Sequence, residues 1–168
     1  ATLVDPSDSM LEGAKVKLSK YKGITYLKAS FHDLLNQKSD PGAHDMFVSA
    51  QAIHHLETDE KAMLFKLIYE KLSSGGMFIN IDVAKPPTEE LEAAYFSIWA
   101  SQMQEIMDRH GVSGFRPEDV IAQYKSPESA NRPDTLETQH GALKDAGFKG
   151  VECYFKSGIF VVYGGYRE

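Results

Sequence analysis

The first residue in this sequence with a clear chemical use is the acidic residue Asp5. It follows the apolar run Ala1–Val4, which is typical of a short β-strand, and Pro6-Ser7 breaks the chain directly after it. A carboxylate at the C-terminal end of a parallel strand lies where open α/β sheets bind ligands, and it can accept hydrogen bonds from both hydroxyls of a ribose. The structural alternative is a carboxylate that only caps the following helix.

The histidines and the cysteine do not form a metal-binding pattern. His54 and His55 are adjacent, whereas two imidazoles on one helix face need a spacing of about three or four residues. The single cysteine, Cys153, excludes an intrachain disulfide and a CxxC pair, which fits a reducing compartment. The sequence therefore predicts no bound metal, and surface positions are expected for His32, His44, His110 and His140.

Composition narrows the class of protein. The chain has 168 residues, 42% of them apolar, which is enough for one domain with a single core. Its 18 basic and 24 acidic side chains give a net charge of −6, which disfavours nucleic acid as a partner. Apolar runs such as Met77–Ile81 are far shorter than the roughly 20 residues of a membrane-spanning helix, and no signal peptide is evident. We expect a soluble, cytoplasmic protein.

Short β-type runs alternate with stretches of helical period along the chain, which predicts the α/β class with a mostly parallel sheet. The expected strands are Ala1–Val4, Ile24–Ala29, Asp45–Ala50 and Met77–Val83. The expected helices are Ser9–Tyr21, Asp59–Leu72, Thr88–Arg109, Pro117–Tyr124 and one that Asp134 opens as a cap and Gly147 closes. Ser73–Gly76 is expected to stop the second helix, and Val151–Lys156 and Ile159–Tyr163 should form an antiparallel hairpin around Ser157-Gly158.

Five segments carry a family resemblance. Leu3–Leu11, with its acidic residue, serine and Met-Leu pair, resembles the second conserved block of class I S-adenosylmethionine-dependent methyltransferases. Further blocks of that family resemble, in the same order, Tyr26–Phe31, His44–Leu56, Glu70–Ile79 and Leu143–Phe148. The resemblance implies a Rossmann-like methyltransferase fold, S-adenosyl-L-methionine as cofactor, and methyl transfer to a small-molecule acceptor.

The resemblance also implies which residues bind the cofactor: Asp5, Pro6, Ser7, Met10, Ser30, Phe31, Ala50, Gln51 and His55. Asp5 would hold the ribose, the residues after it would cover the adenine, and Ala50 with Gln51 would line the methionyl part. Ser30 stands where many relatives carry an aspartate, so adenine recognition would rest on backbone groups near Ser30 and Phe31. The alternatives are core packing for Met10, a solvated loop position for Gln51 and a structural role for His55.

One block of the family pattern has no counterpart, the glycine-rich turn that follows the first strand in relatives. Because Asp5 already belongs to the second block, the resemblance predicts that the first βα unit is missing from this chain. Without it, Ala1–Val4 and Asp45–Ala50 must pair directly or leave open edges, and open edges favour association into a homodimer. We expect a single truncated domain over 1–168, with 88–133 as a helical, lid-like insertion.

The sequence says less about the residues that would contact the methyl acceptor. Its candidates are Asp82, Tyr95, Trp99 and Lys125, with helix capping as the alternative for Asp82 and core packing for the two aromatic residues. Methyl transfer from a sulfonium mainly needs positioning, so no catalytic residue is assigned. The C-terminal part is also distantly similar to carboxy-S-adenosylmethionine synthases, which need an arginine where this chain offers only Lys125. A non-catalytic binding module and a nucleotide-binding enzyme with Asp5 on the ribose are the remaining alternatives.

Overall fold

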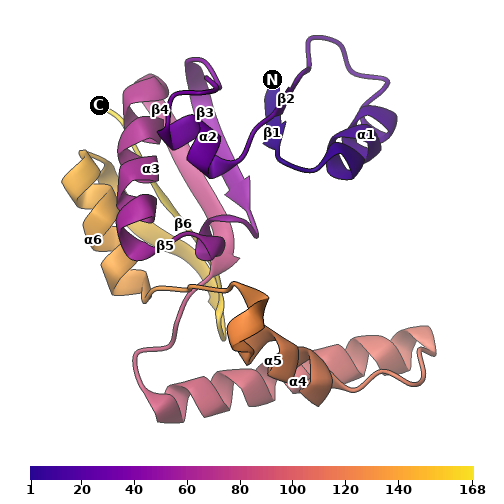
Figure 1. Ribbon diagram of the computed structural model, residues 1–168. Coiled ribbons are helices and arrows are strands. Elements are labelled where there is room, and N and C mark those ends of the chain that lie inside the picture. The colour runs from indigo at the N-terminus through magenta and orange to yellow at the C-terminus, as the bar shows by residue number, and fades with distance from the viewer. The chain divides into compact units, whose positions relative to one another are not determined.

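The computed structural model describes all 168 residues, which form two compact units, Ala1–Ala43 and His44–Glu168 (Figure 1). The N-terminal unit comprises β1 (Thr2–Asp5), α1 (Asp8–Lys17), β2 (Thr25–Lys28) and α2 (Phe31–Leu35). Its two strands are parallel, with Thr2 opposite Thr25 and Asp5 opposite Lys28. Both strands therefore end at the same edge, and the loops after Asp5 and Lys28 leave from that edge together.

The C-terminal unit is built on a four-stranded sheet. Its strands are β3 (His44–Ala50), β4 (Leu72–Val83), β5 (Lys149–Ser157) and β6 (Phe160–Tyr166), in the order β3-β4-β6-β5. β3 and β4 are parallel, whereas β6 is antiparallel to both of its neighbours. This arrangement confirms the α/β class and the antiparallel C-terminal hairpin, in whose turn Gly158 takes a φ of +60°.

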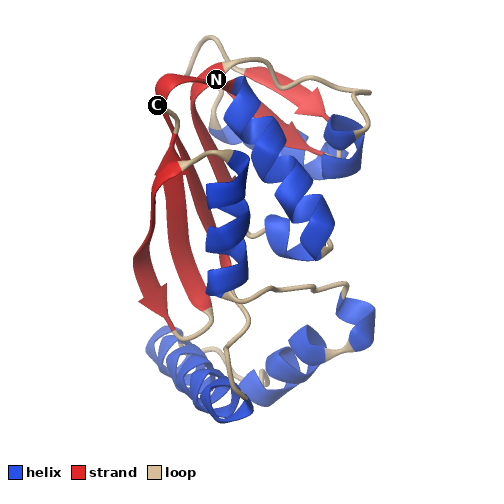
Figure 2. Ribbon diagram, turned by 90° about the vertical axis from the view of Figure 1, so that its left-hand side faces the viewer, coloured by secondary structure: helices blue, strands red, loops and turns tan.

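Helices α3 (Thr58–Lys71) and α6 (Leu136–Ala146) cover one face of this sheet (Figure 2). The core between them contains Phe65, Phe78, Leu143 and Tyr163, each fully buried. The contact is apolar because alternate residues of β4 and β6 point to one face and meet the apolar stripes of both helices.

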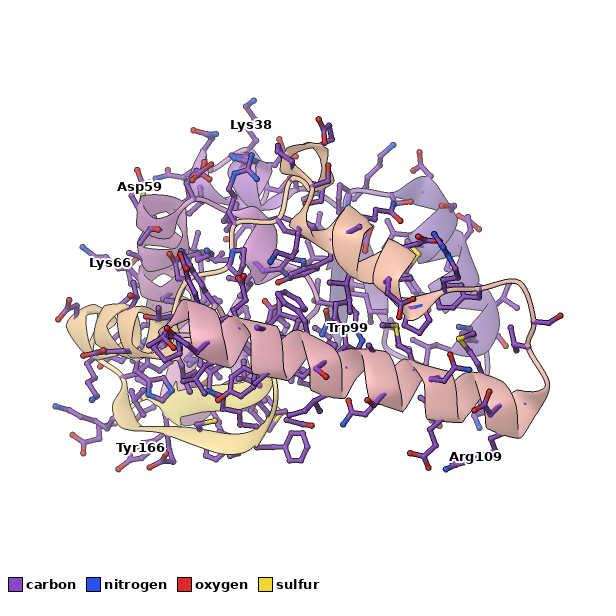
Figure 3. All side chains as sticks on the ribbon, turned by 90° about the horizontal axis from the view of Figure 1, so that it is seen from below. Lys38, Asp59, Lys66, Trp99, Arg109 and Tyr166 are labelled. Carbon is purple, nitrogen blue, oxygen red and sulfur yellow. The ribbon has the colours of Figure 1, made fainter.

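A helical region lies at one end of the sheet and follows β4. It consists of α4 (Glu89–His110), α5 (Pro117–Lys125) and the short helix η2 (Pro127–Ser129), while a three-residue helix, η1 (Ile53–His55), follows β3. Figure 3 shows α4 crossing the view with Trp99 near its middle and Arg109 near its C-terminal end. No helix of the structure combines the length and the apolar character that a bilayer-spanning segment needs.

Two predicted boundaries are wrong. The helix stops just before Ser73–Gly76 as expected, since α3 ends at Lys71, but the strand expected from Met77 begins earlier, at Leu72. Gly75 N donates to Arg167 O, and Arg167 N donates to Gly76 O. The cap of α6 is Thr135, whose Oγ1 accepts a hydrogen bond from Thr138 N, and not Asp134. In both places a partner distant in sequence bonds groups that the local pattern does not link to it.

Candidate functional site

Asp5 lies at the C-terminal end of β1 in the N-terminal unit. Its Oδ1 accepts a hydrogen bond from Ser7 N at 2.7 Å, and Oδ2 has no hydrogen-bond partner within the chain. The cap of α1 is Ser7, whose Oγ accepts from Met10 N at 3.4 Å, so Asp5 does not cap the helix itself. One oxygen of Asp5 is therefore used to shape the turn, and the other is available to a ligand.

The loop after β2 leaves beside Asp5, since Ala29 N donates to Asp5 O at 3.3 Å. Ser30, the next residue, caps α2 in a reciprocal arrangement: its hydroxyl donates to Asp33 Oδ2 at 2.7 Å and accepts from Asp33 N at 3.1 Å. These hydrogen bonds from Ser30 hold the pKa of the Asp33 carboxyl below its usual value. The Ser30 hydroxyl is thus committed to the cap, and the adenine contact assigned to Ser30 and Phe31 stays a prediction.

The other candidates of this unit lie near the same edge. Phe31 is the first residue of α2 and is half-buried, and Pro6 is exposed in the turn after β1. Met10 is 63% exposed, so the alternative of core packing is wrong for this residue. The exposed thioether remains a candidate for a ligand contact.

In the C-terminal unit, Ala50 and Gln51 lie where β3 ends. Gln51 N donates to Ile81 O at 2.8 Å, which continues the parallel pairing with β4 by one residue. The chain then turns sharply, with Gln51 at a φ of +50°, a left-handed conformation that is uncommon for residues with a Cβ. Both side chains are exposed at the carboxyl edge of the sheet.

The two adjacent histidines have different surroundings. His54 is 7% exposed, its Nδ1 lies 2.5 Å from Asp82 Oδ1, and its backbone N donates to Asp82 Oδ2 at 3.1 Å. His55 is exposed, with its Nδ1 3.3 Å from Ala130 O. The ring that packs inward is therefore that of His54, and the cofactor contact assigned to His55 stays a prediction.

Sequence reasoning missed the pair of His54 and Asp82. The two residues are 28 positions apart, and nothing in the local pattern links them. A signal was available in the topology: His54 follows β3, Asp82 lies near the end of β4, and the carboxyl ends of two neighbouring parallel strands meet at one edge.

Asp82 is 1% exposed and is surrounded by donors. Besides the two bonds from His54, its carboxylate accepts from Val83 N at 2.9 Å and from Asn80 Nδ2 at 3.3 Å. Asn80 Nδ2 also donates to Tyr163 OH at 2.7 Å, and that hydroxyl donates to Gln139 Oε1. Burial raises the pKa of Tyr163, which stays a neutral donor. A substrate contact at Asp82 would have to displace one of these bonds, and that contact stays a prediction.

The other acceptor-side candidates belong to an aromatic cluster between α4, α5 and the end of the sheet. Phe96 is its buried centre, and the Trp99 ring lies 5.6 Å from that of Tyr124 and 5.3 Å from that of Phe160. Tyr95 packs against the same cluster. Burial raises the pKa of Tyr124 to about 12, and the negative charges of Asp82 and Glu92 add to the effect.

Lys125 lies at the rim of this aromatic cluster and is exposed. Its Nζ is 2.8 Å from Glu92 Oε2 and 5.0 Å from the centre of the Phe96 ring. The structure therefore brings Tyr95, Trp99 and Lys125 into one region, and it shows that the Lys125 ammonium already has a carboxylate partner.

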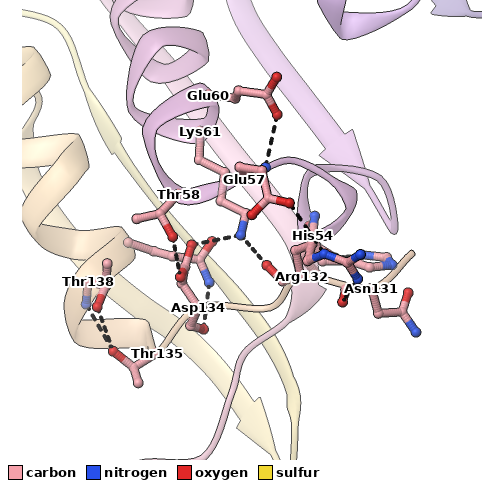
Figure 4. A network of polar contacts seen from close by, with 12 residues as sticks. His54, Glu57, Thr58, Glu60, Lys61, Asn131, Arg132, Asp134, Thr135 and Thr138 are labelled. Atoms are coloured by element: carbon pink, nitrogen blue, oxygen red, sulfur yellow. Dashed lines mark hydrogen bonds and ion pairs between the residues drawn. The ribbon is translucent and has the colours of Figure 1, made fainter. Parts of the chain in front are cut away.

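A polar network ties the segment 130–134 to the start of α3 (Figure 4). Lys61 is 2% exposed, and its Nζ donates to Asp134 Oδ2 at 2.7 Å and to Arg132 O. Thr58 Oγ1 donates to Asp134 Oδ1 at 2.8 Å, and Arg132 N donates to His54 O at 2.7 Å. The loop that precedes α6 is thus fixed against η1 and α3.

Comparison with known proteins adds family information to this geometry. Residues 1–76 match a family model described as "Methyltransferase domain". The carboxy-S-adenosyl-L-methionine synthase of Campylobacter curvus is 27% identical over 161 residues, which cover 95% of this chain and 64% of that protein. The ubiquinone/menaquinone biosynthesis C-methyltransferase UbiE of Klebsiella pneumoniae is 27% identical and covers 98% of this chain and 63% of its own length. The chain thus spans about three fifths of these curated relatives.

Solved structures agree at the level of the fold. The apo form of the S-adenosylmethionine-dependent methyltransferase SibL superimposes on 99% of this chain and 42% of its own length, with a TM-score of 0.65 and 15% identity. At that identity the likeness shows the Rossmann-like fold alone. Together with the family match of residues 1–76, it confirms the recognition made from the sequence blocks. The chain therefore resembles class I S-adenosylmethionine-dependent methyltransferases, and its residues 1–76 match the methyltransferase-domain family model.

Proposed function

We propose that this protein uses S-adenosyl-L-methionine to transfer a methyl group to a small-molecule acceptor. The observation that carries the proposal is the geometry of Asp5. Its Oδ1 is held by Ser7 N at the end of β1, while Oδ2 has no partner within the chain. A carboxylate fixed in this way can accept from a ribose hydroxyl without first giving up a hydrogen bond.

The residues near Asp5 fit the rest of a nucleoside. Ala29 and Ser30 leave the adjacent strand at the same edge, and the capping of α2 fixes the backbone of Ser30 and Phe31. In the C-terminal unit, Ala50 and Gln51 occupy the equivalent carboxyl edge of β3. The cofactor would supply a methyl group already activated by the positive charge of its sulfonium. The chain's own residues would then bind, orient and keep water out.

The second candidate is a carboxy-S-adenosylmethionine synthase, which the relative from Campylobacter curvus favours. Such an enzyme has to hold one more carboxylate. In the stretch 122–125 the only cation is Lys125, and its Nζ is paired with Glu92 at 2.8 Å. The nearby Asp82 and Glu92 also act as negative charges on Tyr124. This local field disfavours an extra anion, and we therefore prefer a methyltransferase.

Isothermal titration calorimetry of S-adenosylhomocysteine into the 168-residue chain tests the proposal. Asp5→Asn keeps an oxygen for Ser7 N but removes the second, charged acceptor, so we expect at least about tenfold weaker binding. Asp8→Asn is the matched control, because it removes one charge from the same turn, where Asp8 pairs with Lys28 Nζ at 2.6 Å on the surface. That change should alter the affinity by less than about threefold.

Three outcomes would contradict the proposal. Absence of binding by the wild-type chain would favour a non-catalytic module, and equal binding by Asp5→Asn would remove Asp5 from the site. Tighter binding of carboxy-S-adenosylmethionine than of S-adenosylmethionine would favour the synthase.

A further inference from the structure

The loop after β3 has little structure of its own. It passes through Gln51, whose φ is +50°, into η1, a helix of only three residues. A helix that short makes too few internal hydrogen bonds to be stable by itself. The position of Gln51–His55 must therefore come from contacts to the rest of the C-terminal unit.

Asp82 supplies the strongest of these contacts. One carboxylate accepts both the backbone N–H of His54, at 3.1 Å, and a bond from the ring at Nδ1, at 2.5 Å. Because both contacts go to one residue, they fix the backbone and the ring orientation of His54 together. The pair is 8% and 1% exposed at its side chains, so water does not compete effectively for these bonds.

Other buried residues in turn hold the Asp82 carboxylate in place. Asn80, Tyr163 and Gln139 are 0%, 0% and 3% exposed and form a continuous line of hydrogen bonds that ends at Asp82 Oδ2. Val83 N donates to the other oxygen at 2.9 Å. The carboxylate is thus connected to β4, β6 and α6, and it cannot turn away from His54 without breaking buried bonds.

The backbone carbonyl of His54 is fixed as well. Its carbonyl oxygen accepts from Arg132 N at 2.7 Å, and the neighbouring His55 Nδ1 lies 3.3 Å from Ala130 O. The segment 130–134 is in turn anchored by Lys61. His54 therefore joins the carboxyl end of β4 to the loop that connects η2 with α6.

We propose that Asp82 is a positioning residue that acts through His54 to hold Gln51–His55 and the segment 130–134 in the conformation that binds the cofactor. The proposal rests on the proposed function, because Ala50, Gln51 and His55 are cofactor candidates there. It assigns Asp82 no contact with substrate and His54 no proton transfer. What it requires is an N–H donor at the place of His54 Nδ1.

This requirement gives a conservative variant. His54→Asn places a side-chain N–H close to the position of Nδ1, whereas His54→Phe keeps a ring and removes the donor. His110→Phe, at the exposed end of α4, controls for loss of a histidine. Each full-length variant is measured for amide hydrogen exchange, for its thermal midpoint and for its Kd for S-adenosylhomocysteine.

For His54→Phe we expect exchange to rise at least about tenfold in 51–56 and 130–134, while the amides of Val161 and Tyr163 stay protected. The Kd for S-adenosylhomocysteine should rise at least about tenfold. His54→Asn should restore both quantities to within about threefold of wild type, as should His110→Phe. Rescue by Asn separates positioning from a proton-transfer role, which asparagine cannot perform.

Unchanged exchange in His54→Phe would overturn the anchoring, whatever the ligand does. Faster exchange with an unchanged Kd would overturn its link to the cofactor. If His54→Phe does not fold, His54→Asn alone decides: wild-type exchange and Kd support the proposal, and loss of both rejects it. If the wild-type chain does not bind S-adenosylhomocysteine, the proposed function fails, and the exchange data still accept or reject the anchoring by Asp82.

Discussion

Lys61 and Asp134, which are 73 positions apart in the sequence, form an ion pair at 2.7 Å with side chains that are 2% and 19% exposed. The same ammonium donates to Arg132 O. A lysine buried to this extent is rare, and it is tolerated because its donors have partners of opposite or partial negative charge. The pair connects α3 to the chain just before α6, the two helices that cover one face of the sheet.

Lys61→Met should lower the free energy of unfolding by about 3 kcal/mol, because it removes the charged donor of Asp134 Oδ2 and of the Arg132 carbonyl, while Thr58 Oγ1 still donates to Asp134 Oδ1. Urea unfolding followed by circular dichroism measures the change. Lys66→Met, at an exposed position on the same helix, is the control and should stay within about 0.5 kcal/mol of wild type. Equal effects of the two substitutions would show that the ion pair contributes nothing net.

Tyr124→Phe should reduce the loss of stability at alkaline pH. Burial, with Asp82 and Glu92, raises the pKa of Tyr124 from 10.0 to about 12. Below pH 10.0 both the folded and the unfolded chain keep the phenol proton of Tyr124, so the contribution of this buried side chain to stability is fully present. Between the two values only the unfolded chain releases it, so the free energy of unfolding falls as the pH rises, by at most about 2 kcal/mol for this partly exposed group.

The measurement is urea unfolding of wild type and variant at about pH 9 and about pH 11.5. The variant should lose less stability between the two conditions than the wild type. Tyr21→Phe is the control, since the Tyr21 side chain is 57% exposed. A wild-type loss equal to that of Tyr124→Phe would place the Tyr124 hydroxyl in water.

Two glycines at α6 should respond in opposite directions to replacement by alanine. Gly147 has a φ of +111°, and a Cβ there would lie 2.9 Å from Tyr69 Cζ, so Gly147→Ala should destabilise the fold by about 2 kcal/mol. Gly141 lies inside the helix, where a Cβ would have no atom within 4 Å, so Gly141→Ala should stabilise by about 0.5–1 kcal/mol. Thermal unfolding compares both variants with wild type, and a shift of the same sign in both would contradict this geometry.

Ser30→Ala should lower stability by about 1 kcal/mol through loss of the α2 cap, and it should raise the pKa of the Asp33 carboxyl toward its ordinary value. Binding of S-adenosylhomocysteine should weaken by less than about tenfold, because the hydroxyl acts on the ligand only through the cap that fixes the backbone of Ser30 and Phe31. Ser19→Ala, at an exposed position without a side-chain bond, is the control. NMR titration measures the pKa of the Asp33 carboxyl, and calorimetry measures binding of S-adenosylhomocysteine. A large loss of affinity would show that the Ser30 hydroxyl contacts the ligand directly.

The sequence pattern predicts much of the fold correctly. The strand at 45–50, the helix at 59–72 and the hairpin around Ser157-Gly158 all occur within a few residues of the expected places. These elements have strong periodicity or a turn residue that requires positive φ, so local physics decides them. The position of Asp5 at a strand end follows from the same reasoning. The five-residue helix α2 was missed, because so short an element has no helical period to detect.

Sequence reasoning missed the interactions that organise the segment 130–134 and the loop after β3. Asp134 looks like a cap three residues before Glu137, yet its carboxylate accepts from Lys61 and Thr58, and Thr135 caps the helix instead. His54 likewise finds Asp82 across the sheet. Such pairs are set by the register of neighbouring strands and helices, and local propensity does not encode them. The cofactor and acceptor roles of the candidate residues stay predictions.

The backbone of Gln51 has a consequence for how the chain leaves β3. Its φ of +50° is about 1 kcal/mol less favourable for a residue with a Cβ than for glycine. A glycine would relieve that strain but would also let the peptide bonds on either side swing through many more directions. Glutamine at this position therefore restricts the direction in which the chain leaves β3, and the cost is backbone strain in the folded state.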